Sequence, residues 1–401
     1  MSRFFGTAAL LLILLSITAM GQDSETLLFG SLQTMFFNQK SNVTLSAPLN
    51  TGAMNISEER STFAVQQMDL FLRKDIGESF SAFVDLEFQL NYSSNNRWGS
   101  MSLQEAWLNY EPTDAFSVKV GMLYPAFNNL NEVKNRLALL PYVFRPGVYE
   151  RLLSSLYMSE NFVPEHAFVQ ISGAVPVEQF FFDYAAYVGN AESSYISYSD
   201  SYGSPVNDLD TKFEFLSGVD PNSFDVKLFG GRLGLRSRTE NFKAGFSLTH
   251  DYDNLNDTTQ FPQMYTGPRA PLIGDASRVR LGADLSGRIG PVNFESEVIK
   301  VLYDHEPAER RDIELDLLFY YTMLGYHVTD RLFLYGSYEG GNSTFDEKWK
   351  RNTVTAGASY RISAAVAAKA QYITYRQFRD EALRLDEVVI KFVFLGFSIV
   401  L

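Results

Sequence analysis

The stretch Leu103–Phe127, LQEAWLNYEPTDAFSVKVGMLYPAF, has the pattern of two strands joined by a tight turn at Pro112–Ala115. In each half, apolar residues alternate with polar or small ones, as in a strand whose two faces meet different surroundings. One phase is Ala106, Leu108, Tyr110, Phe116, Val118, Val120, Met122 and Tyr124; the other is Glu105, Trp107, Asn109, Ser117, Lys119, Gly121 and Leu123. The next segment, 128–165, is far longer than this turn, and the rest of the chain repeats the alternation of short and long connections.

The remaining strands follow the same rhythm. We expect them at 26–37, 62–74, 79–91, 167–174, 180–188, 225–238, 242–250, 278–289, 292–303, 313–327, 332–339, 353–362, 365–376 and 385–401. About sixteen strands with every second connection short predict an all-β fold, a transmembrane antiparallel β-barrel with short periplasmic turns and long extracellular loops. In lipid, only helices and closed barrels satisfy every backbone polar group. The alternative is a secreted β-sandwich or solenoid, although no 20–50-residue repeat supports a solenoid.

Composition narrows the class of protein. The 401 residues are 46% hydrophobic and 14% aromatic, which is ample material for a large fold. The net charge of −13 argues against a nucleic-acid partner, because phosphate binding needs a basic face. The absence of cysteine excludes disulfides, thiolate metal sites, cysteine nucleophiles and an acylated cysteine anchor.

The N-terminus has the features of a signal peptide spanning 1–21. Arg3 gives a short positive region, Ala8–Leu15 is an uninterrupted apolar run, and Ala19-Met20-Gly21 is a small-x-small cleavage site before Gln22. The apolar run is too short to span a bilayer, and no later run is long enough. We therefore expect an exported protein of the Gram-negative outer membrane, with 22–401 forming one barrel domain.

Charged residues in the inward phase of the strands are the pore-lining candidates. Phe80, Ala82, Val84, Leu86, Phe88 and Leu90 form the lipid face of strand 79–91, and Ser81, Phe83, Asp85, Glu87 and Gln89 form the lumen face. Extended to the other strands, this phase gives the candidates Asp85, Glu87, Lys119, Arg232, Arg236, Lys243, Arg280, Asp284, Arg288, Glu295 and Glu297.

The basic members of this set allow two interpretations. Arg232, Arg236, Lys243, Arg280 and Arg288 step along neighbouring strands, and arginine forks bind phosphates and carboxylates, so they could form an anion track. Alternatively, they pair with Asp284, Glu295 and Glu297 and hold the wall rigid. The acidic loop 191–224 would favour cations at the extracellular mouth.

The long segment 128–165 is the constriction candidate. Loops of this length without their own structure are usually functional, and apolar residues such as Leu140, Tyr142 and Phe144 suit packing against an inner wall. Val148, Leu152 and Leu156 predict a short helix. Glu132, Lys134, Arg136, Arg145, Glu150 and Arg151 would set up a transverse field across the pore. The alternative is a loop packed on the extracellular surface.

Catalytic and metal-binding patterns are weak. The four histidines, at positions 166, 250, 305 and 327, fall on different expected segments and suggest no triad. The acidic run 251–257 lacks the glycine and distal glutamate of a calcium loop, so a solvated loop is the better interpretation. We expect no enzyme, no cofactor and no metal site.

A family resemblance adds to this picture. The run LQEAWLNYEPTDAFSVKVGMLYPAFN resembles the fourth and fifth strands of the phosphate-selective porin O/P superfamily. FFFDYAAYVGNAES, FGGRLGL and GADL are similar to later strands of that family, so the likeness covers nearly the whole mature chain. The resemblance implies an inward-folded loop after the fifth strand and a homotrimer.

The C-terminus, Gly396–Leu401, fits the ending that the outer-membrane barrel assembly machinery reads. The sequence thus predicts an outer-membrane porin, a passive channel for small hydrophilic solutes or ions with membrane lipid around it. Two alternatives stay open. One is an anion- or phosphate-selective channel, and the other is a non-conducting barrel, plugged by 128–165, that acts as an adhesin or assembly scaffold.

Overall fold

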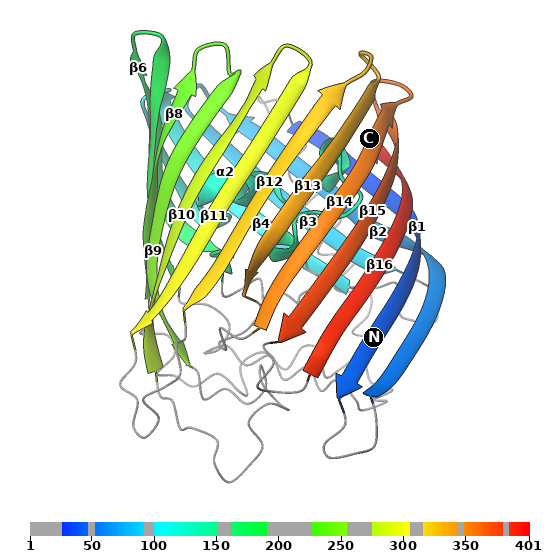
Figure 1. Ribbon diagram of the computed structural model, residues 1–401. Helices are drawn as coiled ribbons and strands as arrows, with labels where there is room; N and C mark the ends of the chain where they lie inside the picture. Colours follow the sequence, from blue (N-terminus) through cyan, green and yellow to red (C-terminus); the bar gives the residue numbers. More distant parts are fainter. Residues whose placement is uncertain are drawn as a thin grey trace, which may run out of the picture.

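The computed structural model describes residues 26–46, 53–91, 100–150, 162–190, 227–254, 275–304, 316–342, 349–379 and 385–401. Within these ranges, sixteen strands form one closed antiparallel barrel in which sequence neighbours pair and β1 pairs with β16 (Figure 1). The predicted signal peptide and the acidic loop 191–224 lie outside the described residues. In the part of the chain that is described, no helix is long and apolar enough to cross a membrane.

The strand connections alternate in length, as the sequence predicts. The strands are β1 (Thr26–Ser46), β2 (Ala53–Ile76), β3 (Phe80–Asn91), β4 (Ser100–Thr113), β5 (Phe116–Leu123), β6 (Ala167–Val177), β7 (Phe180–Asn190), β8 (Lys227–Ser237), β9 (Phe242–Asn254), β10 (Asp275–Ile289), β11 (Val292–Asp304), β12 (Leu317–His327), β13 (Leu332–Asn342), β14 (Trp349–Arg361), β15 (Val366–Arg379) and β16 (Leu385–Val400). Turns of two to four residues gather at one end of the barrel (Figure 1). The predicted sixteen-stranded barrel is confirmed.

The barrel closes through its first and last strands. Their ladder runs from Ser31 opposite Val400 to Leu45 opposite Leu385. Beyond it, Gly30 and Leu401 exchange two backbone hydrogen bonds, of 3.2 and 2.8 Å. Closure pairs the first strand with the last, so the sheet has no free terminal edge, which a bilayer requires.

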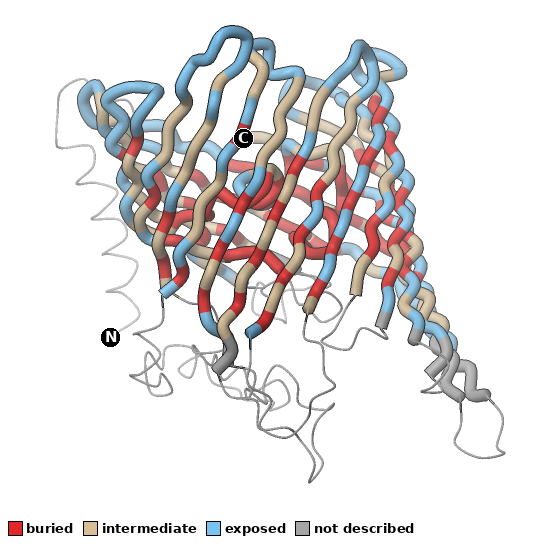
Figure 2. Tube along the Cα trace, turned by 60° about the vertical axis from the view of Figure 1, so that its left-hand side comes forward, coloured by how far each residue is buried: buried red, intermediate tan, exposed pale blue. Residues whose placement is uncertain are grey.

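Each strand has a lipid face and a lumen face. On β3, Phe83, Asp85 and Glu87 are buried inside, whereas Phe80 on the other phase is 44% exposed. Large apolar side chains such as Leu233 are exposed all around the outer wall. The buried residues form a belt at mid-height (Figure 2). This two-sided wall is that of a transmembrane barrel.

The first hairpin is longer than predicted. The sequence pattern ends its strands at Phe37 and begins again at Thr62, but pairing continues to Ser46 opposite Ala53. The apolar–polar alternation fails there because this extension has polar residues in both phases.

Tyr124 also differs from expectation. It lies beyond the end of β5, buried, and donates its hydroxyl hydrogen to Gln104.

The two faces of β6 give a direct test of this architecture. Ile171 is 42% exposed on the outer wall, whereas the next residue, Ser172, lines a recess inside. We expect Ile171→Lys to cost about 2–4 kcal/mol of folding free energy in a bilayer, because a lysine near mid-membrane must leave water. Ser172→Lys should cost much less. Equal losses in denaturant titrations from liposomes would contradict the two-sided wall.

Candidate functional site

The segment after β5 lies inside the barrel. It contains α2 (Asn128–Val133) and two 3₁₀ turns, η2 (Leu137–Leu139) and η3 (Gly147–Tyr149) (Figure 1). β5 prepares the inward bend at Gly121, whose φ is +127°, and a Cβ there would lie 2.2 Å from the Ala106 carbonyl oxygen. The inward-folded constriction loop is therefore confirmed for its described parts. Where the sequence predicts a helix with Val148, the structure has only η3, which ends at Tyr149 because Glu150 is extended; positions 152 and 156 of that prediction lie outside the described residues.

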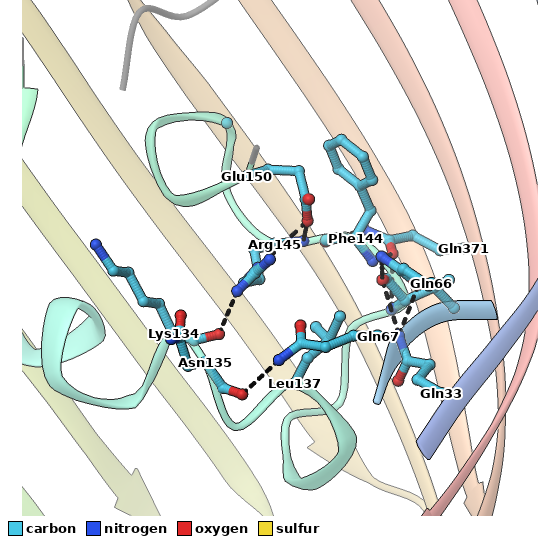
Figure 3. Close-up of polar contacts among 12 residues, drawn as sticks. Gln33, Gln66, Gln67, Lys134, Asn135, Leu137, Phe144, Arg145, Glu150 and Gln371 are labelled. Atoms are coloured by element: carbon cyan, nitrogen blue, oxygen red, sulfur yellow. Dashed lines mark hydrogen bonds and ion pairs between the residues drawn. The ribbon is translucent and has the colours of Figure 1, made fainter. Parts of the chain in front are cut away.

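Three glutamines clamp the centre of this loop (Figure 3). Gln33 and Gln66 both donate to the carbonyl oxygen of Val143, over 3.0 and 2.7 Å. The side-chain oxygen of Gln371 accepts from the backbone N–H groups of Val143 (3.0 Å) and Phe144 (2.7 Å), and its amide nitrogen donates to the Phe144 carbonyl (2.9 Å). The glutamines come from β1, β2 and β15. Their side-chain amides bind the backbone groups of the loop, which a neighbouring strand would bind in a sheet.

A β-bulge supplies one of these glutamines. The β1–β2 register shifts between Gln33 and Thr34, and this leaves Gln66 as an extra residue in β2. Gln66 and its neighbour Gln67 are consequently both buried inside, although adjacent strand residues normally face opposite ways. Gln67 uses its position to donate to the Asn135 carbonyl over 2.6 Å.

A second bulge does the same in β4. The β3–β4 register shifts after Asp85, and Gln104 has no partner in the ladder. The side chains of Gln104 and Glu105 therefore both point into the barrel. Each contacts Tyr124, at the start of the loop. Gln104 accepts from the Tyr124 hydroxyl, and Glu105 accepts from the Tyr124 backbone N–H over 3.3 Å.

Aromatic packing fixes one side of the loop. Phe144 stacks on Phe392 and Phe394 of β16, with ring centroids 6.4 and 5.3 Å apart. Tyr142 meets Tyr335 of β13 edge-on at 5.4 Å. These contacts belong to an apolar cluster whose wall residues lie on β1, β2, β11–β13, β15 and β16. The loop thus covers the aromatic half of the lumen.

Wall carboxylates bind the rest of the loop. Glu297 accepts from the Leu130 N–H (2.8 Å) and from the Tyr149 hydroxyl, and Glu339 accepts from the Gly147 N–H (2.9 Å). Burial, reinforced by the neighbouring Glu297 charge, raises the pKa of Tyr149 well above its ordinary value. Tyr149 therefore keeps its proton and remains a donor. The Tyr142 hydroxyl lies 3.3 Å from Glu295, which is likewise occupied with the loop.

Three of the six predicted constriction charges, Lys134, Arg145 and Glu150, are buried in the loop. Arg145 pairs with Glu150 at 3.3 Å and also donates to the Lys134 carbonyl (Figure 3). Glu132 and Arg136 are the described members that remain exposed. Arg151 lies outside the described residues. The lysine that faces the loop is Lys369 of β15, which donates to the carbonyls of residues 137 and 138.

All of the predicted pore-lining residues lie in the inward phase of their strands, but several of the arginines are paired. Arg232 forms a forked pair with Asp284, with one N–O distance of 2.9 Å. Arg236 binds Asp183 and Glu240. Arg280 binds Asp251, at 3.2 Å. Arg232, Arg236 and Arg280 thus pair with carboxylates of the barrel wall. Glu295 and Glu297, which the sequence offered as further partners, bind the loop and not these arginines.

A polar recess of about 370 Å³ lies between the loop and β4–β9. Its lining includes the predicted residues Lys119, Glu132, Arg232, Arg236 and Lys243, together with Gln170 and Asp183. A second recess, of about 410 Å³, lies on the other side of the loop and has Tyr142, Met323 and Phe333 in its lining. Among the described side chains, no group of histidine, aspartate and glutamate is suited to hold a metal ion.

Comparison with known proteins gives a result at the level of the fold. No family model and no curated protein matches the sequence. An anion-selective porin from Comamonas acidovorans superposes with a TM-score of 0.56 at 14% identity, over 94% of this chain and 100% of that one.

Two further solved structures agree. The outer membrane channel DcaP of Acinetobacter baumannii gives a TM-score of 0.53 at 10% identity, over 94% of this chain and 97% of that one. The trimer form of in-vitro folded OmpT, from Vibrio cholerae, gives 0.50 at 12%, over 95% and 100%. The chain therefore has the barrel fold of outer-membrane porins, and membership of the O/P superfamily stays a prediction.

The glutamine clamp gives the test of the loop's attachment. Gln371→Ala leaves two N–H groups and one carbonyl of the loop without their partner, at about 1–3 kcal/mol for each buried group. We expect faster proteolysis within the loop of the folded barrel. Gln39→Ala is the control, because Gln39 is bonded to Ser41 of its own strand. Equal cleavage rates for the two variants would contradict the clamp.

Proposed function

We propose that the protein is an outer-membrane porin, a passive channel for small hydrophilic solutes or ions. The observation that carries the proposal is the recess of about 370 Å³, where cations and carboxylates line the inner wall beside the loop. The likeness to barrels described as porins and channels supports the same function at the level of the fold. Passive diffusion needs no cofactor and no covalent step.

We infer that solutes pass on the polar side of the loop. On the other side, Phe144 and Tyr142 are in ring contact with the aromatic wall, and these contacts narrow the space beside the second recess. On the polar side, Lys119, Lys243 and Arg232 are partly exposed, and Glu132 is exposed. Partly exposed charges lower the cost of moving a hydrated ion along the wall.

The path can be located with two matched substitutions. Ala185 of β7 lines the polar recess, and Ala367 of β15 lines the recess across the loop. We expect Ala185→Trp to lower single-channel conductance in planar bilayers severalfold, because the indole fills the path. Ala367→Trp should leave conductance nearly unchanged. The reverse pattern would place the path on the other side of the loop.

Anion preference is a finer proposal within this function. Arg232 is paired with Asp284, so the two opposite charges largely cancel and contribute little to the electrostatic potential in the recess. Lys243 forms no ion pair with a described carboxylate, and the Lys119 ammonium sits over the Trp107 ring, 4.8 Å from its centroid. We propose that these two lysines, rather than the arginine strip, attract anions in the recess.

Reversal potentials in a salt gradient test this assignment. Lys243→Gln removes one positive charge that is in no ion pair with a described carboxylate, so we expect a shift toward cation selectivity. The double variant Arg232→Gln with Asp284→Asn removes a charge pair and leaves the net charge unchanged, so the potential should stay near that of the wild type. If the reversal potential shifts in the double variant and not in Lys243→Gln, the arginines and not the lysines determine selectivity.

A second candidate function is a non-conducting barrel that serves as a scaffold or adhesin. It is favoured by the mid-height belt, where lumen-facing residues such as Gln33, Asp85, Ser247 and Glu297 are almost fully buried (Figure 2). Steady current through the folded protein in a planar bilayer would exclude it.

The signal peptide, recognition of the C-terminal strand by the assembly machinery, and a homotrimer remain proposals. The trimer form of the OmpT barrel agrees with the last of these.

A further inference from the structure

The outer wall carries a strip of basic side chains near the long-loop end. Four adjacent strands each contribute one: Lys350 from β14, Arg376 from β15, Lys391 from β16 and Lys40 from β1. All four are exposed, and at three of the positions at least one strand neighbour is buried inside, for example Tyr375 beside Arg376 and Phe392 beside Lys391. The four side chains therefore point out of the barrel. We call them the outward basic strip.

The strip contains a like-charge pair. Lys40 and Lys391 are direct partners in the β1–β16 ladder, an arrangement that is destabilising without a counter-charge. Elsewhere on the outer wall, Lys300 has such a partner, because its ammonium lies 2.9 Å from Asp316. Among the described residues, no carboxylate forms an ion pair with any member of the strip. Glu59, opposite Lys40 on β2, instead accepts from the amide of Asn38 at 3.1 Å.

The strip lies next to outward-facing tyrosines. Tyr320 and Tyr338 are in contact on the outer wall, with ring centroids 6.0 Å apart. The Tyr338 hydroxyl donates to Asn352 over 2.8 Å, and Asn352 is the direct ladder partner of Arg376. Outward tyrosines mark the interface between hydrocarbon and headgroups in membrane barrels. The basic strip is thus at headgroup depth, on the side of the long loops.

We propose that the outward basic strip binds phosphate groups of anionic lipid headgroups, whose negative charge no cation of the same headgroup neutralises, in the leaflet nearest the long loops. Directly opposed residues in a ladder have Cα atoms about 4.5–5.5 Å apart, so both lysine ammonium groups reach one phosphate oxygen cluster. The phosphate then gives the two lysines a shared counter-charge, since Glu59, across the ladder from Lys40, forms no ion pair with either of them, and the neighbouring guanidinium adds a forked contact. The proposal rests on the barrel spanning a membrane and not on conduction.

The test compares stability in two kinds of vesicle. Wild type, Lys40→Gln/Lys391→Gln and the control Lys300→Gln are folded into phosphatidylcholine vesicles with or without diphosphoryl lipid A, and urea midpoints are measured. Lipid A should raise the midpoints of wild type and Lys300→Gln, but not that of the double variant. In phosphatidylcholine alone, where each phosphate already has the choline cation of its own headgroup as counter-charge, the double variant should be at least as stable as wild type, because a repulsion is gone. Arg376→Gln should lose part of the lipid A effect.

Several outcomes would overturn the proposal. One is a midpoint that rises equally with lipid A stripped of its phosphates, since phosphate would then have no part in it. Another is an equal rise with inorganic phosphate in place of lipid A, which would indicate an ion site. A third is an equal loss of the effect in Lys300→Gln. Conductance of the double variant should match wild type, so failure here is distinguishable from failure of the porin assignment.

Discussion

Pairing between the first and last strands is the constraint on which the molecule depends. A bilayer offers no water to an unpaired N–H or carbonyl group, so sixteen strands are stable only when β1 meets β16 along its length. Closure also creates an enclosed space. Sixteen strands enclose more volume than their own inward side chains fill, and the chain places the segment after β5 there.

The strands could be predicted because lipid imposes a strict rule on one face. Wherever that face is apolar, as on β3 or β12, period-two alternation identifies both the strand and its inward residues. The rule ends where the membrane ends. The extension of the first hairpin from Asn38 to Ser46 is paired but has polar residues in both phases, so its sequence shows no clear period. Tyr124 leaves the outer phase for a different reason, because it lies beyond the end of β5 in the segment that bends inward.

The candidate site was predictable only in part. The length and apolar content of 128–165 indicate an inward loop, because an exposed loop has no need of residues such as Phe144. The attachment of the loop could not be predicted, because the glutamines that hold it come from β1, β2 and β15 and bind backbone groups. Every residue has backbone groups, so the sequence does not show which of them are bound.

The sequence did contain one local signal of this attachment. The doublet Gln66-Gln67 breaks the alternation of β2, and such a break is what a bulge produces. The pairing of Arg232 with Asp284 depends on register across two strands, which the pattern alone does not fix.

The neutral character of the glutamine clamp bears on how the loop responds to voltage. A membrane potential does work of about 2.3 kcal/mol per 100 mV on each elementary charge that crosses it. Glutamine amides and backbone groups carry no such charge. The segment 128–165 has four acidic residues (Glu132, Glu150, Glu160, Glu165) and four basic ones (Lys134, Arg136, Arg145, Arg151), so its formal charge is zero. Displacing the whole loop along the pore axis therefore moves no net gating charge, and a uniform field gives the loop no preference between an inward and a withdrawn position.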